Sequence, residues 1–444
     1  MNCNNQVVTI RKLVNGGYGL AHTNDGTTLF ARFGLPGERV SVHITEHRKK
    51  TVFGHVIEVY ESHPGRISPP CPYYGRCGGC NLQHLSYEYQ GTLKQQIVTE
   101  LLAASDGEDL RRALSRIEPI RASPMEMNYR QRIRLAVDSH CSVGFRNFRS
   151  RDVVAIESCL LAVEPINSCF KKLARRRSFQ DLVRISEQLE LCCNPLDETV
   201  SALFYLIRSP RPADRRNARA LTGEVENLDR VFFGGSRFAM EGPYTSRDSA
   251  SHRLIGFSLD KDRPLTLRWE VGGFSQVNLQ QNRYLIDLVT RLATPDPQDL
   301  ILDLYCGMGN FSLPLALHGA EVHGIESQGS AVRSGRRNCM ENNITTCHFE
   351  QSDVESACRR LAAEGRRFDI VVCDPPRRGL AELIPYLARI AAGKLIYISC
   401  DPATLSRDLS ALTSSGFEIR SIHPLDMFPQ THHIETVVAM NKRG

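Results

Sequence analysis

The second half of the chain alternates between two kinds of segment, and this alternation constrains the fold more than any other feature. From about residue 270 onward, short apolar runs of β-strand type are separated by segments with helical periodicity. The runs occupy residues 300–304, 321–325, 370–373, 394–399 and 434–440. This pattern predicts a Rossmann-like α/β domain with a doubly wound, mostly parallel sheet. Ligands bind outside the carboxyl ends of such strands, so residues that directly follow the runs are candidates for a site.

The chain of 444 residues is too long for one domain. A single hydrophobic core rarely grows beyond about 250–300 residues, so two or three domains are expected. Residues 1–62 are predicted to form a small, OB-like β-barrel, because short strand-type runs alternate there with Gly and Pro turns. Residues 63–268 are predicted to form a central α+β domain, and residues 269–444 the α/β domain. The expected barrel strands span 7–13, 28–33, 39–44 and 53–59, and a helix is expected over 85–103.

Basic runs point to an anionic partner, although the net charge of +6 is mild. They lie at residues 48–50, 171–177 and 211–219. Such runs suit the phosphates of RNA, while each run taken alone is equally consistent with a solvated surface. Residues 144–151 interleave aromatic and basic side chains, a pattern that suits base stacking as well as a half-exposed strand.

Nothing in the sequence predicts a membrane or a secretory route. No stretch of about 18 apolar residues is present, and the first ten residues lack the pattern of a secretory signal. We therefore expect a cytoplasmic protein that binds RNA and neither a membrane nor DNA. A monomer is the default expectation.

A glycine-containing loop follows the first run of the α/β domain. It reads Asp303-Leu304-Tyr305-Cys306-Gly307-Met308-Gly309-Asn310-Phe311. The glycines allow a tight turn and a close approach of the backbone to a ligand. Glu326 follows the next run, where a carboxylate can accept both hydroxyls of a ribose. The loop lacks the third glycine of the dinucleotide fingerprint, which favours S-adenosylmethionine over a pyrophosphate ligand.

Three further residues directly precede or follow strand-type runs. Asp374 begins Asp374-Pro375-Pro376-Arg377, whose prolines fix the backbone just outside the sheet; an ordinary turn is the alternative. Cys400 follows the run 394–399 near an expected helix N-terminus, which predicts a lowered thiol pKa; a buried packing cysteine is the alternative. Glu435 lies at the start of the last run, after a proline-fixed, His-rich segment, and is a candidate general base.

Three motifs together resemble the RNA uracil-5-methyltransferase family, in both its tRNA and its 23S rRNA members. They are the loop around Gly307 and Gly309, the segments from Asp374-Pro375-Pro376-Arg377-Arg378-Gly379 to Tyr397-Ile398-Ser399-Cys400, and Leu425-Asp426-Met427-Phe428-Pro429-Gln430-Thr431-His432-His433-Ile434-Glu435. The resemblance implies that Cys400 is the nucleophile and Glu435 the base. It also implies contacts to S-adenosylmethionine at Gln276, Tyr305, Asn310, Glu326, Asp353 and Asp374.

The chemistry of the base explains both roles. Carbon 5 of uracil is a poor nucleophile, and attack of a thiolate on carbon 6 makes it nucleophilic. After methyl transfer, a base removes the carbon 5 proton so that the thiolate can leave. One departure from the family is Asp401, which stands where members usually have Asn; an added carboxylate raises the thiol pKa. Residues 1–60 also resemble a TRAM domain, a small RNA-binding barrel.

A second group of cysteines lies near the barrel. The chain has 15 cysteines, and clustered cysteines in the cytoplasm indicate metal ligation or catalysis. Cys71, Cys77 and Cys80 form C-x5-C-x2-C and need a fourth ligand. Spacing alone leaves open a zinc site, with His84 nearby, and a four-iron cluster. The 23S rRNA members carry a fourth cysteine in an Ile-Glu-x-Cys segment, so the resemblance implies a structural [4Fe–4S] cluster on Cys71, Cys77, Cys80 and Cys159.

The resemblance implies 23S rRNA rather than tRNA as the substrate, because the tRNA-specific bacterial members of the family generally lack both the barrel and the cluster. The alternatives are a tRNA uracil-5-methyltransferase, an RNA-binding protein with a decayed methyltransferase domain, and a cytosine or DNA methyltransferase. In each RNA case the target base must be unstacked to reach Cys400.

Overall fold

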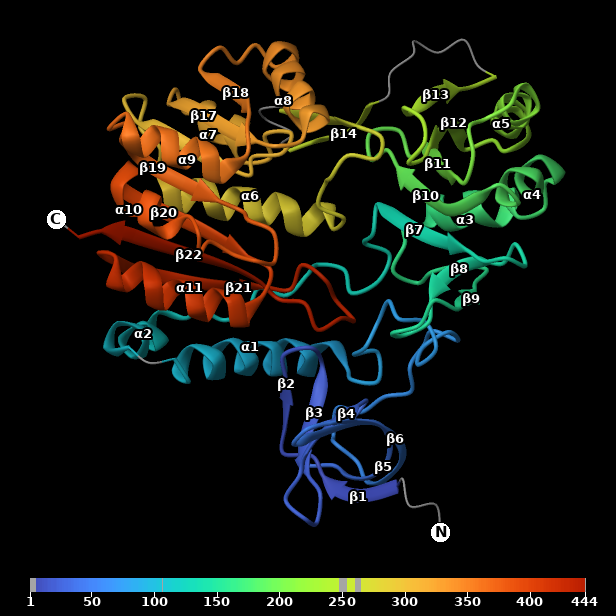
Figure 1. Cartoon of the computed structure of the whole chain (residues 1–444), viewed down its shortest axis with the longest axis horizontal. Coiled ribbons are helices and arrows are strands. Elements are labelled where there is room, and N and C mark those ends of the chain that lie inside the picture. Colours follow the sequence, from blue (N-terminus) through green and yellow to red (C-terminus); the bar gives the residue numbers. More distant parts are fainter. Residues whose placement is uncertain (1–4, 106, 247–253, 260–264, 444) are drawn as a thin grey trace.

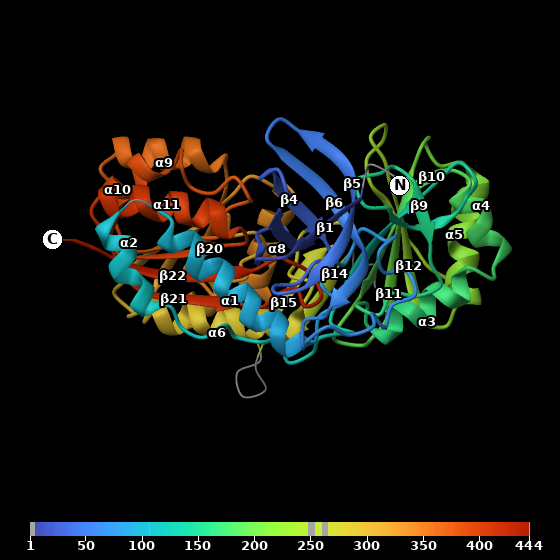
Figure 2. The same cartoon turned by 90° about the horizontal axis from the view of Figure 1, so that it is seen from below.

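The computed structural model describes residues 5–105, 107–246, 254–259 and 265–443 (Figure 1). Three larger sheets organise these residues, and a short hairpin forms a fourth. In Figure 1 the N-terminal barrel lies below the other two sheets, which stand side by side; Figure 2 shows the same arrangement from below. No helix within these ranges is long and apolar enough to cross a membrane.

The N-terminal barrel is a six-stranded sheet in the order β1-β5-β6-β4-β3-β2. Alternate residues along β3 and β4 are buried, as expected for strands with one face toward a core. The expected strand 7–13 is divided in two, because Asn5–Thr9 pair with β5 whereas Lys12–Val14 pair with β3. The strands are β1 Asn5–Thr9, β2 Lys12–Val14, β3 Tyr18–His22, β4 Thr28–Arg32, β5 Arg39–Arg48 and β6 Thr51–Glu61.

The central sheet has seven strands in the order β13-β12-β11-β10-β7-β8-β9. Strands β10 and β11 are almost entirely buried, because the sheet packs with α3, α4 and α5 around one core. The strands are β7 Arg132–Val137, β8 Val143–Arg146, β9 Val153–Ala155, β10 Ser186–Cys193, β11 Val200–Leu206, β12 Leu228–Gly234 and β13 Glu241–Tyr244. The helices are α3 Glu164–Leu173, α4 Arg177–Val183 and α5 Pro212–Glu224.

The C-terminal sheet has seven strands in the order β18-β17-β16-β19-β20-β22-β21. The first five strands are parallel, and β22 is antiparallel to both its neighbours. This confirms the predicted doubly wound α/β fold. The strand order reverses between β16 and β19, so the ligand crevice of such a sheet lies outside their carboxyl ends. The strands are β16 Leu300–Leu304, β17 Glu321–Glu326, β18 Cys347–Gln351, β19 Phe368–Cys373, β20 Ala391–Ser399, β21 Phe417–Leu425 and β22 Glu435–Lys442.

Helices cover both faces of this sheet. One core contains residues of α1, α9, α10 and α11, and the other contains residues of α6, α7 and α8. Helix α1 precedes the central sheet in the chain but packs against α11, below β21 and β22 in Figure 1. The hairpin of β14 (Leu254–Ser258) and β15 (Thr266–Glu270) packs against α8. The helices are α1 Tyr87–Ala103, α2 Glu108–Ala113, η1 Leu114–Arg116, α6 Leu279–Ala293, α7 Ser312–Ala316, α8 Gly329–Glu341, α9 Val354–Ala363, α10 Ile384–Ile390 and α11 Pro402–Ser414.

Candidate active site

The strand register places Cys400 next to Glu435. Strands β20 and β22 are antiparallel, and Ser399 pairs with Thr436. The next pair toward the edge of the sheet is therefore Cys400 and Glu435. Cys400 directly follows β20 and precedes Asp401, the N-cap of α11. Two residues that are distant in the chain thus meet at the edge where the parallel strands end.

Burial controls the ionisation of both groups. Glu435 is only 3% exposed, and its burial raises the pKa of its carboxyl well above the usual value. Burial also raises the pKa of the Cys400 thiol to about 12, with further increases from the carboxylates of Glu435, Asp374 and Asp401. Arg377 acts in the opposite direction. The expectation that the helix N-terminus lowers this pKa is therefore wrong for the free protein, because loss of solvent outweighs the helix dipole.

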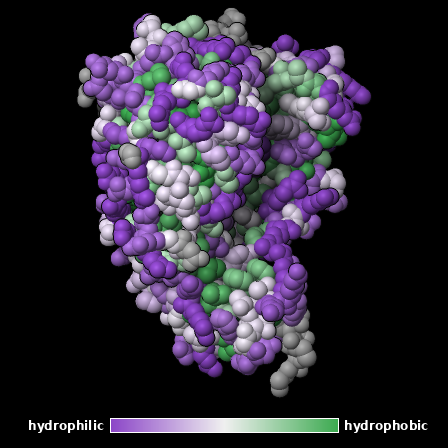
Figure 3. Space-filling view, turned by 60° about the vertical axis from the view of Figure 1, so that its left-hand side comes forward, coloured by the Kyte–Doolittle hydropathy of each residue, from purple (hydrophilic) through white to green (hydrophobic). Residues whose placement is uncertain are grey.

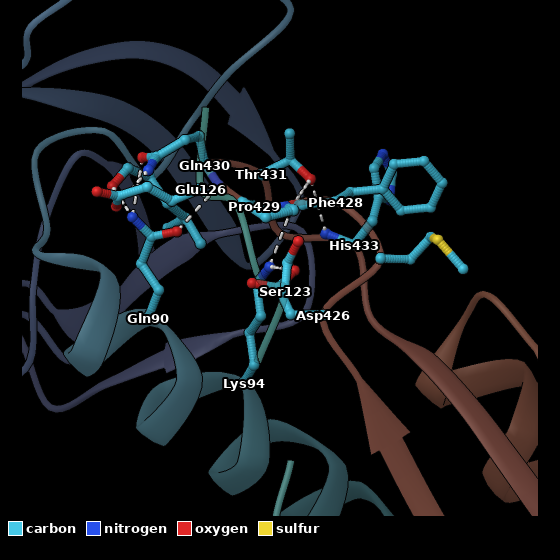
Figure 4. Close-up of polar contacts among 12 residues, drawn as sticks. Gln90, Lys94, Ser123, Glu126, Asp426, Phe428, Pro429, Gln430, Thr431 and His433 are labelled. Atoms are coloured by element: carbon cyan, nitrogen blue, oxygen red, sulfur yellow. Dashed lines mark hydrogen bonds and ion pairs between the residues drawn. The ribbon is translucent and has the colours of Figure 1, made fainter. Parts of the chain in front are cut away.

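The loop 426–433, which leads into Glu435, is held by helix α1. The Lys94 ammonium, 0% exposed, donates to Asp426 Oδ1 at 2.7 Å and to the Phe428 carbonyl at 3.2 Å. The Gln90 amide donates to Gln430 Oε1 at 2.9 Å, and Gln90 Oε1 accepts the backbone N–H of Gln430 at 3.0 Å. Figure 4 shows these contacts between α1 and the loop. A buried charge pair of this kind fixes geometry, because neither ion has water as an alternative partner.

Two histidines of the loop lie beside the same edge. Arg377 Nη2 donates to His433 Nε2 at 3.2 Å, and the two imidazole rings lie 4.1 Å apart. Burial lowers the pKa of His432 to about 4 and that of His433 to about 3. Both rings are therefore neutral at neutral pH, and Arg377 supplies positive charge near Cys400.

Three of the predicted cofactor residues, Tyr305, Glu326 and Asp374, lie at the carboxyl ends of parallel strands. Tyr305 follows β16 with a positive φ of 62°, and Glu326 ends β17. The backbone N–H of Gly307 donates to Glu326 Oε2 at 3.2 Å, which ties the loop to the next strand end. Gly309 has a φ of +92°, and a Cβ there would lie 2.1 Å from Leu313 Cδ1, so only glycine fits.

The remaining predicted cofactor residues differ in how free their side chains are. Asp374 follows β19, and burial raises the pKa of its carboxyl to about 7. Asn310 exchanges two amide hydrogen bonds with Asn282, at 2.9 and 3.0 Å. Asp353 caps α9 by accepting the backbone N–H of Ser356 at 2.9 Å. Gln276 lies in the segment between β15 and α6, before the N-cap of α6.

The four predicted cluster cysteines line one cavity of about 590 Å³. Cys71, Cys77 and Cys80 come from the loop before α1, and Cys159 from the segment before α3. In the space-filling view, one face of the molecule is hollowed between its two larger lobes (Figure 3). Burial raises the thiol pKa of Cys77, of Cys159 and, to about 12, of Cys80.

Across the described ranges, no three or more His, Cys, Asp or Glu side chains are grouped so that they could hold a metal ion. His84 hydrogen-bonds the Tyr74 hydroxyl at 2.6 Å through Nδ1 and packs against the Phe33 ring. The His84 ring therefore lies against the N-terminal barrel. The four thiols suit a polynuclear cluster in their chemistry, since such clusters take four cysteine thiolates spread around a cube.

Several residues that shape this site carried no signal in the sequence. Lys94 and Gln90 lie on α1 and contact a loop more than 300 residues away. Asn81 donates through Nδ2 to His432 Nδ1 at 2.8 Å. Local patterns predict local structure, and these contacts depend on the assembled fold.

Known proteins match the chain over nearly its whole length. The family model described as tRNA (Uracil-5-)-methyltransferase matches residues 257–443, and that of the TRAM domain matches residues 4–57. The 23S rRNA (uracil(1939)-C(5))-methyltransferase RlmD of Pseudomonas putida is 34% identical over 443 residues, covering 97% of this chain and 92% of the relative. The protein of the same name from Alkalilimnicola ehrlichii is 33% identical over 448 residues, covering 98% and 96%.

A solved structure has a fold similar to that of this chain. The tRNA (uracil-54, C5)-methyltransferase of Pyrococcus abyssi, in complex with S-adenosyl-L-homocysteine, has a TM-score of 0.73 and 25% identity, covering 98% of this chain and 100% of that chain. The sheet and its carboxyl edge define an S-adenosylmethionine-dependent methyltransferase. The chain belongs to the RNA (uracil-5-)-methyltransferase family, and an N-terminal TRAM domain accompanies its methyltransferase fold.

Proposed function

We propose that this protein methylates carbon 5 of one uridine in 23S rRNA through a covalent intermediate on Cys400. The observation that carries the proposal is the register of β20 and β22, which places Cys400 and Glu435 side by side. Both lie at the sheet edge that also holds Asp374 and the glycine loop that begins at Tyr305. A nucleophile and a base at one ligand-binding edge are what the chemistry of carbon 5 requires.

The residues act in a fixed order. The Cys400 thiolate adds to carbon 6 of the uracil, and the electron pair released to carbon 5 attacks the methyl group. S-adenosylmethionine supplies that group from a sulfonium, and S-adenosylhomocysteine is the product. Glu435 then takes the proton from carbon 5, and elimination breaks the bond between carbon 6 and Cys400 Sγ. The raised pKa of the Glu435 carboxyl makes it a stronger base once it is ionised.

Acidic residues at the edge suit the cofactor. Glu326 ends β17, and we assign the ribose hydroxyls to its carboxylate; Asp374 follows β19, which lies at the reversal point of the strand order. We also assign cofactor contacts to Gln276, Tyr305, Asn310 and Asp353. Asp303, fully buried behind the loop, has a carboxylate Oδ2 bonded to the Ser312 hydroxyl and a pKa raised by burial to about 7. A cationic ligand nearby would favour the ionised form of both Asp303 and Asp374.

The substrate is tested by offering several RNAs. Purified protein is incubated with methyl-labelled S-adenosylmethionine and either 23S rRNA lacking modifications or a tRNA transcript. The proposal expects 5-methyluridine in the 23S rRNA at one position. Label in tRNA alone would assign the chain to the tRNA branch, which the Pyrococcus abyssi structure represents. Label on cytosine would contradict uracil chemistry.

We propose further that Cys71, Cys77, Cys80 and Cys159 hold a [4Fe–4S] cluster. The support is their convergence on one cavity from two separate segments. Bound there, the cluster would join the loop before α1 to the segment before α3. Protein purified without air should contain about four iron atoms per chain. Cys159→Ser should lose the iron, while Cys141→Ser, at an exposed cysteine, should keep it. Stoichiometric zinc without iron would overturn this assignment.

A further inference from the structure

The turn between β2 and β3 of the N-terminal barrel reaches the residue that follows Cys400. Asn15 Nδ2 donates to Asp401 Oδ2 at 3.4 Å, across 386 positions of sequence. Asp401 Oδ1 meanwhile accepts the backbone N–H of Thr404 at 2.8 Å and so caps α11. Each oxygen of this carboxylate therefore has its own donor, one from its helix and one from the barrel.

A second contact joins the same turn to the histidine loop through Asn81. Asn81 Nδ2 donates to the Gly16 carbonyl at 3.2 Å and to His432 Nδ1 at 2.8 Å. Its backbone N–H donates to the Gln430 carbonyl at 3.1 Å. Asn81 directly follows Cys80, so one residue links the barrel, the cluster loop and the loop that leads into Glu435.

The contact is closely packed. Gly17 has a φ of +74°, and a Cβ there would lie 2.4 Å from Asn81 Nδ2 and 3.1 Å from His432 Cβ. Only glycine satisfies both the backbone conformation and the space. The barrel is also anchored elsewhere, since Arg66 Nη2 donates to Glu38 Oε2 and to the Phe33 carbonyl, each at 2.6 Å. Loss of the Asn15 contact alone therefore leaves the barrel docked.

We propose that the turn 15–17 of the barrel forms part of the catalytic centre, in which Asn15 and Asn81 are positioning residues for Asp401 and His432. The inference rests on the proposed function of Cys400 and adds a role for the barrel beyond holding RNA. Asn15 fixes the residue next to the nucleophile, and Asn81 fixes the loop that carries the base. The barrel turn then contributes to the rate of methyl transfer at saturating RNA.

The first test separates rate from affinity. Asn15→Ala should lower kcat about tenfold, the effect of losing one hydrogen bond to a charged group, while the Kd for 23S rRNA stays unchanged. Asn5→Ala is the matched control, because Asn5 also lies in the barrel and hydrogen-bonds His43 at an exposed position, at 2.9 Å. It should keep the wild-type kcat. An unchanged kcat in Asn15→Ala, or a loss explained by a weaker Kd, overturns the proposal.

Exchanging the amide of Asn15 with the carboxylate of Asp401 gives a sharper test, because the double variant conserves the total charge. Asn15→Asp places two carboxylates face to face and should reduce kcat more than Asn15→Ala does. Asp401→Asn alone should be mild, since the Asn15 amide can turn and accept. The double variant Asn15→Asp, Asp401→Asn restores one donor and one acceptor, and it should recover most of the lost rate. A structural defect would persist in the double variant, and additive losses there would contradict positioning.

Failure of this inference is distinguishable from failure of the proposed function. If the wild-type chain makes no 5-methyluridine, the proposed function of Cys400 fails, and the inference that rests on it fails too. If the wild type is active and the Asn15 variants match it in kcat, only the role of the barrel turn fails. Circular dichroism of each variant shows that the chains compared are folded.

Discussion

Two groups of cysteines in this chain are buried to a similar degree but differ in their neighbours. Cys400 and the four cysteines around the cavity are all partly buried, and burial raises the thiol pKa of Cys400, Cys77, Cys80 and Cys159. Cys400, however, stands alone among carboxylates and Arg377 at a strand end. The other four line one cavity from two segments.

The difference shows how position decides the chemistry of a thiol. To a single cysteine beside a buried carboxyl, at the ligand-binding edge of an α/β sheet, we assign attack on a substrate. To the four cysteines that line one cavity we assign a shared metal cluster. Buried thiols with raised pKa values serve either purpose, because a metal or a substrate complex can stabilise the thiolate when it forms. The predictions below separate the two groups.

The largest effect is expected at Cys400. Cys400→Ala removes the nucleophile and should reduce turnover by more than about 10⁴-fold. Binding of S-adenosylmethionine and the iron content should stay near wild type, since the substitution touches neither set of residues. Turnover is measured as 5-methyluridine formed, and iron by a colorimetric assay. Normal product from this variant would remove the covalent mechanism.

Glu435→Gln should slow product release by about 10²- to 10⁴-fold, the range for loss of a general base. Methyl transfer itself should still occur, so protein linked to methylated RNA should accumulate and survive denaturation. The adduct is seen as a shifted band on a denaturing gel. Free, fully methylated RNA at a normal rate would mean that another group is the base.

Lys94→Met should lower the folding free energy and disturb the site around Cys400, while the four cysteines of the cavity keep their iron. It leaves Asp426 buried without its cation, which costs about 3–5 kcal/mol of folding free energy. Lys12→Met is the control, because Lys12 pairs with Glu100 at an exposed position and should cost less than about 1 kcal/mol. Denaturant unfolding measures both. We expect kcat to fall in Lys94→Met with the iron retained, and equal stability losses in the two variants would refute the argument.

The last prediction concerns pH, where the expected effect is at most about tenfold for each pH unit. Because burial raises the pKa of the Cys400 thiol to about 12, the fraction of thiolate in the free protein grows with pH. Adduct formation should therefore accelerate by up to about tenfold per unit between about pH 6 and about pH 9. Single-turnover rates with the RNA bound at saturation test this. A flat profile would show that the thiol is already ionised when it reacts.

The sequence predicted the interior of the C-terminal sheet better than its edges. The run 300–304 coincides with β16, and the five central strands were all expected. Strands β18 and β21 were missed because they are the edge strands: each is partly exposed and interleaves polar residues with apolar ones. The central sheet was expected only as an unresolved mixture of strands and helices. Strands β10 and β11 form a hairpin, but β10 also pairs with β7, which lies more than 50 residues earlier in the chain, and no local pattern predicts that neighbour.

The site divides in the same way. Residues at strand ends, such as Glu326 and Asp374, could be predicted because topology alone brings them to one edge. Their proposed roles, like those of Cys400 and Glu435, stay predictions. Asn15 and Lys94 could not be found, since neither belongs to a motif and each contacts a partner over 300 residues away. Burial reverses the pKa shift that position at a helix N-terminus suggested for Cys400.

Covalent trapping tests the central claim most directly. The protein is mixed with S-adenosylmethionine and 23S rRNA that carries 5-fluorouridine. In this base, fluorine replaces the carbon 5 proton that Glu435 would remove, so the covalent adduct cannot be released. The account predicts a denaturation-resistant adduct in which mass spectrometry finds the modified nucleotide on Cys400. Absence of an adduct, with cofactor and RNA both shown to bind, or an adduct on any other residue, would contradict it.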